Sequence, residues 1–147
     1  MARLRVSHIG ICVSDWRRSL RFYHDVLGFR YLHEFEVSGG PASRLLQLEK
    51  VELRAVYLER EGLRIELLHY EQPGPVSGPT PRPMNQLGIT HLSLRVDDLD
   101  EVVRELVEAG VEVRDDTRIE LPAAQTKAVF ISDPDGALIE LVEQPGD

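Results

Sequence analysis

Two histidines and two glutamates stand at repeated positions in this sequence, and together they could bind a metal ion. His8 and His91 lie in similar alternating stretches 83 residues apart, and Glu66 and Glu140 lie in similar stretches 74 residues apart. Glu140 interrupts the apolar run 138–142, where a charged carboxylate costs free energy unless it is paired or bound to a metal. If the two copies pair about a pseudo-twofold axis, the four side chains converge in one cleft.

The types of these side chains indicate which metals they would bind. Imidazole nitrogens and carboxylate oxygens together suit Zn, Ni, Co, Mn or Fe, and they suit Ca or Mg poorly because imidazole is not a hard oxygen ligand. Four protein ligands in an octahedral shell leave two positions open, so that the metal can act as a Lewis acid and chelate a substrate through two oxygens. The four residues are therefore predicted to be metal ligands.

A simpler interpretation exists for each residue taken alone. A single histidine on a strand is more often a hydrogen-bonded structural residue, and a single glutamate on a strand more often faces solvent. Four such residues at repeat-related positions favour the metal site over that interpretation.

Each copy begins with a predicted strand and helix. Residues 5–13 alternate between apolar and other side chains, which indicates a half-buried strand with His8 on the face opposite Ile9. Ser14 or Asp15 can cap the helix that follows, and Gly28 can end it. The offset of 83 is kept by Val13 and Val96, Asp15 and Asp98, Trp16 and Leu99, Leu20 and Val103, and Tyr23 and Leu106.

The rest of each copy is predicted to form strands. In the first copy they are residues 29–36, 46–58 and 63–70, and in the second they are 111–114, 119–121, 127–132 and a last strand that carries Glu140. Runs of strands without intervening helices favour mixed or antiparallel sheets. The predicted fold class is α+β, with two tandem βαβββ modules forming a cup-shaped mixed sheet. The register of the strand 46–58 stays open.

A Pro-rich segment separates the two copies. Five of the nine prolines lie between residues 72 and 83, a composition that cannot sustain a helix or a sheet and is typical of a semi-extended linker. The predicted organisation is a first module at 1–71, a linker at 72–87 and a second module at 88–147, all within one structural domain.

Further residues have side chains that could also bind a metal or contact a substrate. Cys12 shares the face of His8, but a small buried hydrophobe is its predicted role. His24 and His33 have no repeat partner and are predicted to be surface residues. Ser93 and Arg95 share the face of His91 and are candidates for contact with substrate.

Composition excludes several classes of partner. The chain has 147 residues, a formal net charge of −8 and no run of Lys and Arg, whereas nucleic acids and anionic membranes require a basic footprint. A small soluble molecule is the expected partner. The single cysteine and the absence of a charged-then-apolar leader at the start predict a reducing, cytoplasmic location.

The sequence resembles the vicinal oxygen chelate superfamily, which includes glyoxalase I, methylmalonyl-CoA epimerase, extradiol dioxygenases and the fosfomycin or bleomycin resistance proteins. The resemblance spans nearly the whole chain and rests on the segments 8–11, 19–29, 65–68, 90–99, 133–136 and 139–141. Carried over by position, it implies that His8, Glu66, His91 and Glu140 bind a divalent metal (Ni, Co, Zn, Mn or Fe). It also implies a homodimer.

The resemblance is closest to glyoxalase I and methylmalonyl-CoA epimerase, and it implies an isomerase or lyase. Such an enzyme removes a proton next to a carbonyl, with Glu140 as the first choice for the base and Glu66 returning the proton. Glutathione-binding glyoxalases usually carry an arginine where this chain has Cys12, and the epimerases usually carry a His-Pro-Lys segment where it has residues 132–136. The alternatives are a ligand-sequestering resistance protein and, less favoured, an extradiol-type dioxygenase, which generally lacks the glutamate found at position 66.

Overall fold

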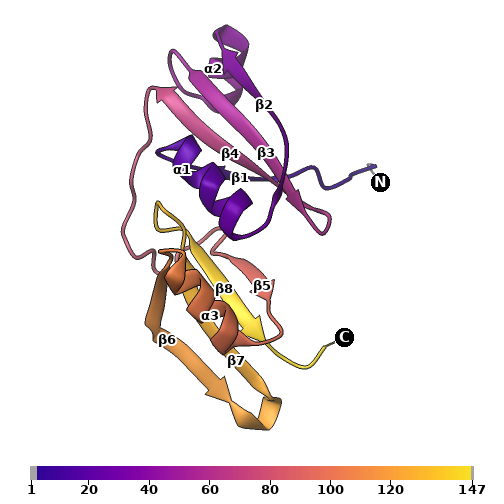
Figure 1. The fold of residues 1–147 in the computed structure, drawn as a ribbon. Coiled ribbons are helices and arrows are strands. Elements are labelled where there is room, and N and C mark those ends of the chain that lie inside the picture. Colours follow the sequence, from indigo (N-terminus) through magenta and orange to yellow (C-terminus); the bar gives the residue numbers. More distant parts are fainter. Residues whose placement is uncertain (1–2, 147) are drawn as a thin grey trace. The chain divides into compact units, whose positions relative to one another are not determined.

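The computed structural model describes residues 3–146, and the chain divides into two compact units, residues 1–77 and 78–147. Each unit contains a four-stranded mixed sheet with a helix between its first two strands (Figure 1). The predicted α+β fold with tandem βαβββ modules is confirmed. In the described part of the chain, no helix is long and apolar enough to cross a membrane.

The first unit contains β1 (Ile9–Cys12), α1 (Trp16–Leu20) continued by a π-helical segment η1 (Arg21–Val26), β2 (Arg30–Ser38), α2 (Gly40–Leu46), β3 (Glu52–Arg60) and β4 (Leu63–Gln72). Its sheet has the order β1-β4-β3-β2, in which only the β1–β4 pair is parallel. The β3–β4 turn uses Glu61 and Gly62, both with positive φ, as a two-residue hairpin of this hand requires.

The second unit repeats this topology with β5 (Leu92–Arg95), α3 (Leu99–Glu108), β6 (Glu112–Leu121), the short 3₁₀ segment η2 (Pro122–Ala124), β7 (Thr126–Ser132) and β8 (Leu138–Glu143). Its sheet has the order β5-β8-β7-β6, again with one parallel pair, β5–β8. The two predicted strands at 111–114 and 119–121 are one strand, β6, whose pairing with β7 is irregular between Arg114 and Ile119.

The first helix of each unit begins with the same capping hydrogen bond. The Asp15 carboxylate accepts a hydrogen bond from the backbone N–H of Arg18, and the Asp98 carboxylate accepts one from Glu101. Both are N-caps that satisfy a backbone donor in the first helical turn. They keep the offset of 83 that the sequence showed.

One expectation for the first unit is corrected. The strand predicted at 46–58 begins only at Glu52, because α2 occupies residues 40–46. The Gly-Gly-Pro sequence at 39–41 is typical of a loop, but proline is well tolerated in the first turn of a helix, and Ala42 and Leu46 pack against Val51 and Leu53. This packing stabilises a helix even though the glycines and the proline at its start are typical of a loop.

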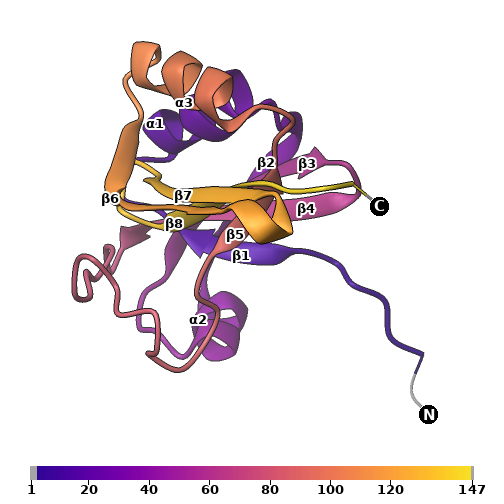
Figure 2. The same ribbon diagram turned by 90° about the horizontal axis from the view of Figure 1, so that it is seen from below.

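The two helices of the first unit cover opposite faces of its sheet. Figure 2 shows α1 on one side and α2 on the other. Side chains alternate along a strand, so the buried Val56 and Leu58 face one side, while Leu53 and Tyr57 face the other. Because α2 packs on Leu53, it covers one end of the face that carries Tyr57 and its neighbour Glu66.

The turn before β8 is held by a buried carboxylate. Asp133 is 4% exposed, and its Oδ1 accepts hydrogen bonds from the backbone N–H groups of Asp135 and Ala137, at 2.9 and 2.8 Å. Gly136 supplies the positive φ that the turn needs. The turn therefore sets where β8 begins, and with it the position of Glu140.

We expect the substitution Asp133→Ala to lower the free energy of unfolding by about 2–3 kcal/mol, because two backbone donors lose a charged acceptor in a buried turn. Asp133→Asn should cost less, since the amide oxygen can still accept. Urea denaturation measures both, with the exposed Asp97→Ala as the control. A loss in Asp133→Ala no larger than that in the control would contradict this role.

Candidate metal-binding residues

The first unit brings His8 and Glu66 together. Glu66 lies on β4 directly opposite Gly10 of β1, and His8 lies just before β1. His8 Nε2 and Glu66 Oε2 are 3.1 Å apart, and the carboxylate side chain is only 12% exposed. The predicted pair of ligands from this unit is therefore in contact.

The second unit places His91 just before β5 and Glu140 opposite Ser93 on β8. The Ser93 hydroxyl donates a hydrogen bond of 2.8 Å to Glu140 Oε1. Within residues 3–146, His91 and Glu140 form no ion pair. Both histidines thus precede their strands by one residue and do not belong to them, a small difference from the prediction.

The two histidines are held in the same way. His8 Nδ1 hydrogen bonds with the hydroxyl of Ser7 at 2.8 Å, and His91 Nδ1 with that of Thr90 at 2.7 Å. Each contact leaves Nε2 as the ring nitrogen available to a ligand. Metal-bound histidines commonly have their second ring nitrogen engaged in this manner.

Each histidine ring also packs edge-on against an aromatic ring of the neighbouring strand. His8 contacts Tyr57 with ring centroids 5.1 Å apart at 87°, and His91 contacts Phe130 at 5.4 Å and 89°. Tyr57 pairs with Glu66 and Phe130 pairs with Glu140. The arrangement of histidine, aromatic ring and glutamate is therefore the same in both units.

Strand register extends this arrangement into a row of four residues across each sheet. In the first unit the row is Gly10, Glu66, Tyr57 and His33, and in the second it is Ser93, Glu140, Phe130 and Arg114. Paired residues of neighbouring strands lie on the same face of a sheet. His33, Tyr57 and Arg114 thus share a face with a predicted ligand.

Tyr57 contacts its neighbours on both sides in the row of the first unit. It stacks on His33 with ring centroids 4.9 Å apart at 19°, and on Phe35 at 5.8 Å and 23°. Burial, followed by a hydrogen bond to Glu66, raises the pKa of Tyr57 to about 12. The phenol is therefore neutral near pH 7 and donates a hydrogen bond to the Glu66 carboxylate.

Comparison with known proteins identifies the family. The model of the Glyoxalase/Bleomycin resistance protein/Dioxygenase superfamily matches residues 5–141. The chain belongs to this superfamily. It is 32% identical over 140 residues to the uncharacterized protein YaeR of Escherichia coli, covering 95% of this chain and 96% of the relative.

Solved structures of the superfamily share the fold. A glyoxalase family protein from Bacillus cereus superimposes with a TM-score of 0.83 at 24% identity, covering 99% of this chain and 97% of that one. The trypanothione-dependent glyoxalase I of Leishmania major gives a TM-score of 0.67 at 22% identity, covering 96% and 87%. Superfamily members bind small molecules and commonly use divalent metals.

The donor atoms fit such a metal. Ligands at adjacent octahedral positions lie about 3.0 Å apart when their bonds are about 2.1 Å long, and His8 Nε2 and Glu66 Oε2 are separated by 3.1 Å. Among residues 3–146, no three His, Cys, Asp or Glu side chains gather closely enough to hold a metal ion. Each unit by itself supplies one imidazole and one carboxylate.

The other candidate residues from the sequence differ in their exposure and contacts. The prediction that Cys12 is buried is wrong: it is exposed, since β1 is an edge strand of its sheet. His24 and His33 are exposed, as predicted, but His33 also belongs to the ring stack on Tyr57. Ser93 contacts Glu140.

The sequence analysis did not select several residues that contact the predicted ligands or share a row with them. They differ in whether the sequence contains a pattern that could have indicated them. Ser7 and Thr90 keep the offset of 83 and precede each histidine, so the sequence did contain this pattern. Tyr57, Phe130 and Arg114 require the register of the middle strands, which alternation alone does not give.

Tyr57→Phe is expected to change how stability depends on pH. The raised pKa means that folding favours the neutral phenol, so this contribution is complete below about pH 10 and is lost as pH rises through about 12. The difference in unfolding free energy between wild type and Tyr57→Phe should therefore shrink between about pH 10 and 12. Tyr31→Phe, which removes an exposed tyrosine, is the control. A difference that does not depend on pH would refute the assignment.

Proposed function

We propose that the protein is a divalent-metal-dependent isomerase or lyase that abstracts a proton α to a carbonyl, in the manner of glyoxalase I or methylmalonyl-CoA epimerase. His8, Glu66, His91 and Glu140 would hold the metal, which would be Ni, Co, Zn, Mn or Fe. The observation that carries this proposal is the repeated pair: each unit has an imidazole with Nδ1 engaged by the preceding hydroxyl, next to the strand that carries a glutamate.

The chemistry follows from the residues of the chain and a metal that they would bind. A bound divalent metal would supply positive charge that stabilises the anion formed when a carbon next to a carbonyl loses its proton. Glu140 accepts that proton, and Glu66 delivers one to the neighbouring carbon or to the opposite face. Positioned bases of this kind contribute about 10²- to 10⁴-fold to the rate.

The contacts of the two carboxylates support different roles. Glu66 is in contact with both His8 Nε2 and the Tyr57 hydroxyl, which restrain it from two sides. Glu140 is held by the Ser93 hydroxyl, a contact that a small side-chain rotation breaks. The less restrained carboxylate is better suited to move toward a substrate and take its proton.

Assembly is part of this proposal. Each unit carries half of the four ligands, so a complete set requires one unit of each kind, from one chain or from two. We propose a homodimer acting in the cytoplasm on a small molecule. Light scattering on the purified protein tests the dimer.

Metal binding is the first test. Protein stripped with a chelator should regain one metal per quartet and be stabilised by Ni, Co, Mn or Zn, by about 2.7 kcal/mol when free metal exceeds the dissociation constant 100-fold. His8→Ala and His91→Ala should each weaken binding at least 100-fold, while His24→Ala, on the exposed face of η1, should not. Stripped protein that gains neither metal nor stability would instead support the ligand-sequestering alternative.

Exchange of the substrate proton is the second test. With thiol hemithioacetals and methylmalonyl-CoA-like thioesters as substrates in D₂O, Glu140→Gln should slow deuterium incorporation about 10²- to 10⁴-fold while metal stays bound. NMR follows the exchange and plasma emission measures the metal. Full turnover by Glu140→Gln with metal bound would remove Glu140 from the role of base.

A further inference from the structure

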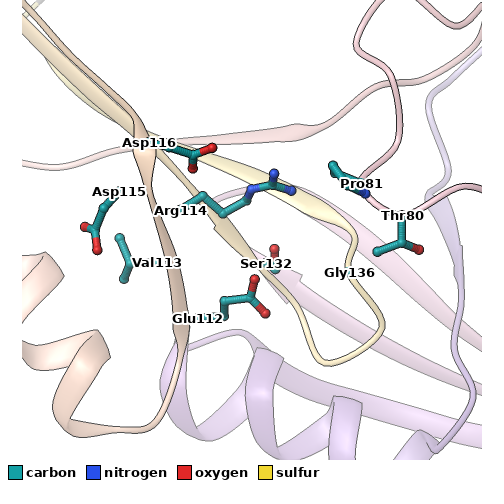
Figure 3. A pocket seen from close by; sticks show the side chains of 9 residues that line it. All are labelled: Thr80, Pro81, Glu112, Val113, Arg114, Asp115, Asp116, Ser132 and Gly136. Carbon is teal, nitrogen blue, oxygen red and sulfur yellow. The ribbon is translucent and has the colours of Figure 1, made fainter.

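The second unit contains a polar pocket of about 410 Å³ at the end of the sheet where β6 begins and β7 ends. Its lining includes Glu112, Arg114 and Asp116 from β6, Ser132 from the end of β7, and Thr80 from the segment before β5. Figure 3 shows Arg114 and Ser132 directed into this pocket. None of these residues is a predicted metal ligand.

Arg114 has a charge and hydrogen-bond donors that no described residue uses. Its side chain is half-buried, yet its guanidinium makes no ion pair or hydrogen bond with any residue of the described range 3–146. Glu112, Asp115 and Asp116 line the same pocket without pairing with it, and Figure 3 shows the Asp115 carboxylate pointing away. A guanidinium presents donors in a fork that matches a carboxylate.

Ser132 supplies a second, independent observation. The residue is 6% exposed, it lines the pocket, and its hydroxyl has no hydrogen-bond partner among residues 3–146. The hydroxyl is not among the buried unpaired side-chain oxygens of the described residues, so it is open to the pocket and can donate to a ligand there. A ligand atom that accepts from both Arg114 and Ser132 would satisfy both groups.

The first unit has ion-paired side chains at the equivalent place. The row equivalent to Glu112, Ser132 and Leu138 is Arg30, Glu59 and Arg64. There Glu59 pairs with both arginines, at 3.3 and 3.6 Å. The first unit thus has a paired glutamate where the second unit has a neutral serine that lines the pocket.

The position of Arg114 sets the kind of ligand. It lies in the row that contains Phe130 and Glu140, and two strand spacings separate Arg114 from Glu140, or about 10 Å between their backbones. We propose that Arg114 and Ser132 form a carboxylate-binding subsite, so that the substrate is a carbonyl compound with a carboxylate on a short chain. This inference rests on the proposed function for the reacting end of the substrate.

The carboxylates around the pocket indicate which class of anionic ligand it favours. Glu112 and Asp116 place negative charge beside the bound anion and oppose a dianion more strongly than a monoanion. A singly charged carboxylate is therefore favoured over a phosphate ester. Replacing both carboxylates by their amides, as in Glu112→Gln with Asp116→Asn, should tighten carboxylate binding several-fold.

The experiment uses chelator-treated, ¹⁵N-labelled full-length protein, so that metal plays no part. Titration with 4-oxopentanoate should shift the amide signals of residues 112–116, 132, 133, 135 and 136, and the methyl ester of the same compound should not. Arg114→Met should weaken binding at least about tenfold and Ser132→Ala a few-fold, as expected for charge-assisted and neutral hydrogen bonds. Arg114→Lys should bind with intermediate strength, because it keeps charge without the fork.

Arg104→Met is the matched control, because Arg104 lies on α3 outside the pocket. Arg114→Met should keep wild-type thermal stability, since no ion pair is lost. Equal binding by wild type and Arg114→Met, equal binding of the ester, or shifts confined to other residues would overturn the subsite. So would the absence of binding by 4-oxopentanoate, pyruvate and glutarate alike.

The outcome is separable from that of the proposed function. Carboxylate binding that depends on Arg114 in a protein without metal affinity would leave the subsite standing and remove the metal-dependent enzyme. Metal binding and proton exchange that do not change in Arg114→Met would leave the metal-dependent enzyme standing and would remove the carboxylate-binding subsite.

Discussion

The parallel pairing between the first and last strands of each unit determines where every candidate ligand lies. Gly10 opposite Glu66, and Ser93 opposite Glu140, place each carboxylate beside the strand that its histidine precedes. A shift of one residue in either pairing would turn the glutamate to the other face of the sheet. The apolar side chains on both sides of each glutamate prevent this shift, because Ile65, Leu67, Ile139 and Leu141 are buried.

Duplication and divergence act on different parts of the molecule. The helix caps, the hydroxyl before each histidine and the aromatic ring beside it are the same in both units. The partners of the glutamates differ: Tyr57 donates to Glu66, while Phe130 has no hydroxyl and Ser93 donates to Glu140. Two carboxylates at equivalent backbone positions thus have unequal restraints, a difference that would suit the unequal roles proposed for them.

The sequence predicted the features that depend on local pattern and repetition. The offsets of 83 and 74 were enough for the fold class, and they selected His8 and Glu66, which the structure shows in contact. It did not predict α2, because Gly39–Pro41 reads as a break while the packing of Ala42 and Leu46 on Leu53 lies outside any local signal. Cys12 was misjudged for a similar reason, since the exposure of a strand depends on whether it lies at a sheet edge.

The row across each sheet shows why the rest could not be predicted. Arg114 is one of 17 Lys and Arg residues in the chain, and nothing in its sequence neighbourhood distinguishes it from those that form surface ion pairs. Only the pairing of β6 with β7 and of β7 with β8 puts it in line with Glu140. In the first unit the equivalent position is His33, stacked on Tyr57. The row of the first unit therefore ends in a stacked His33, and that of the second unit ends in Arg114, which pairs with no described residue. Because the backbones are equivalent, this difference resides in the side chains, which can change without changing the fold.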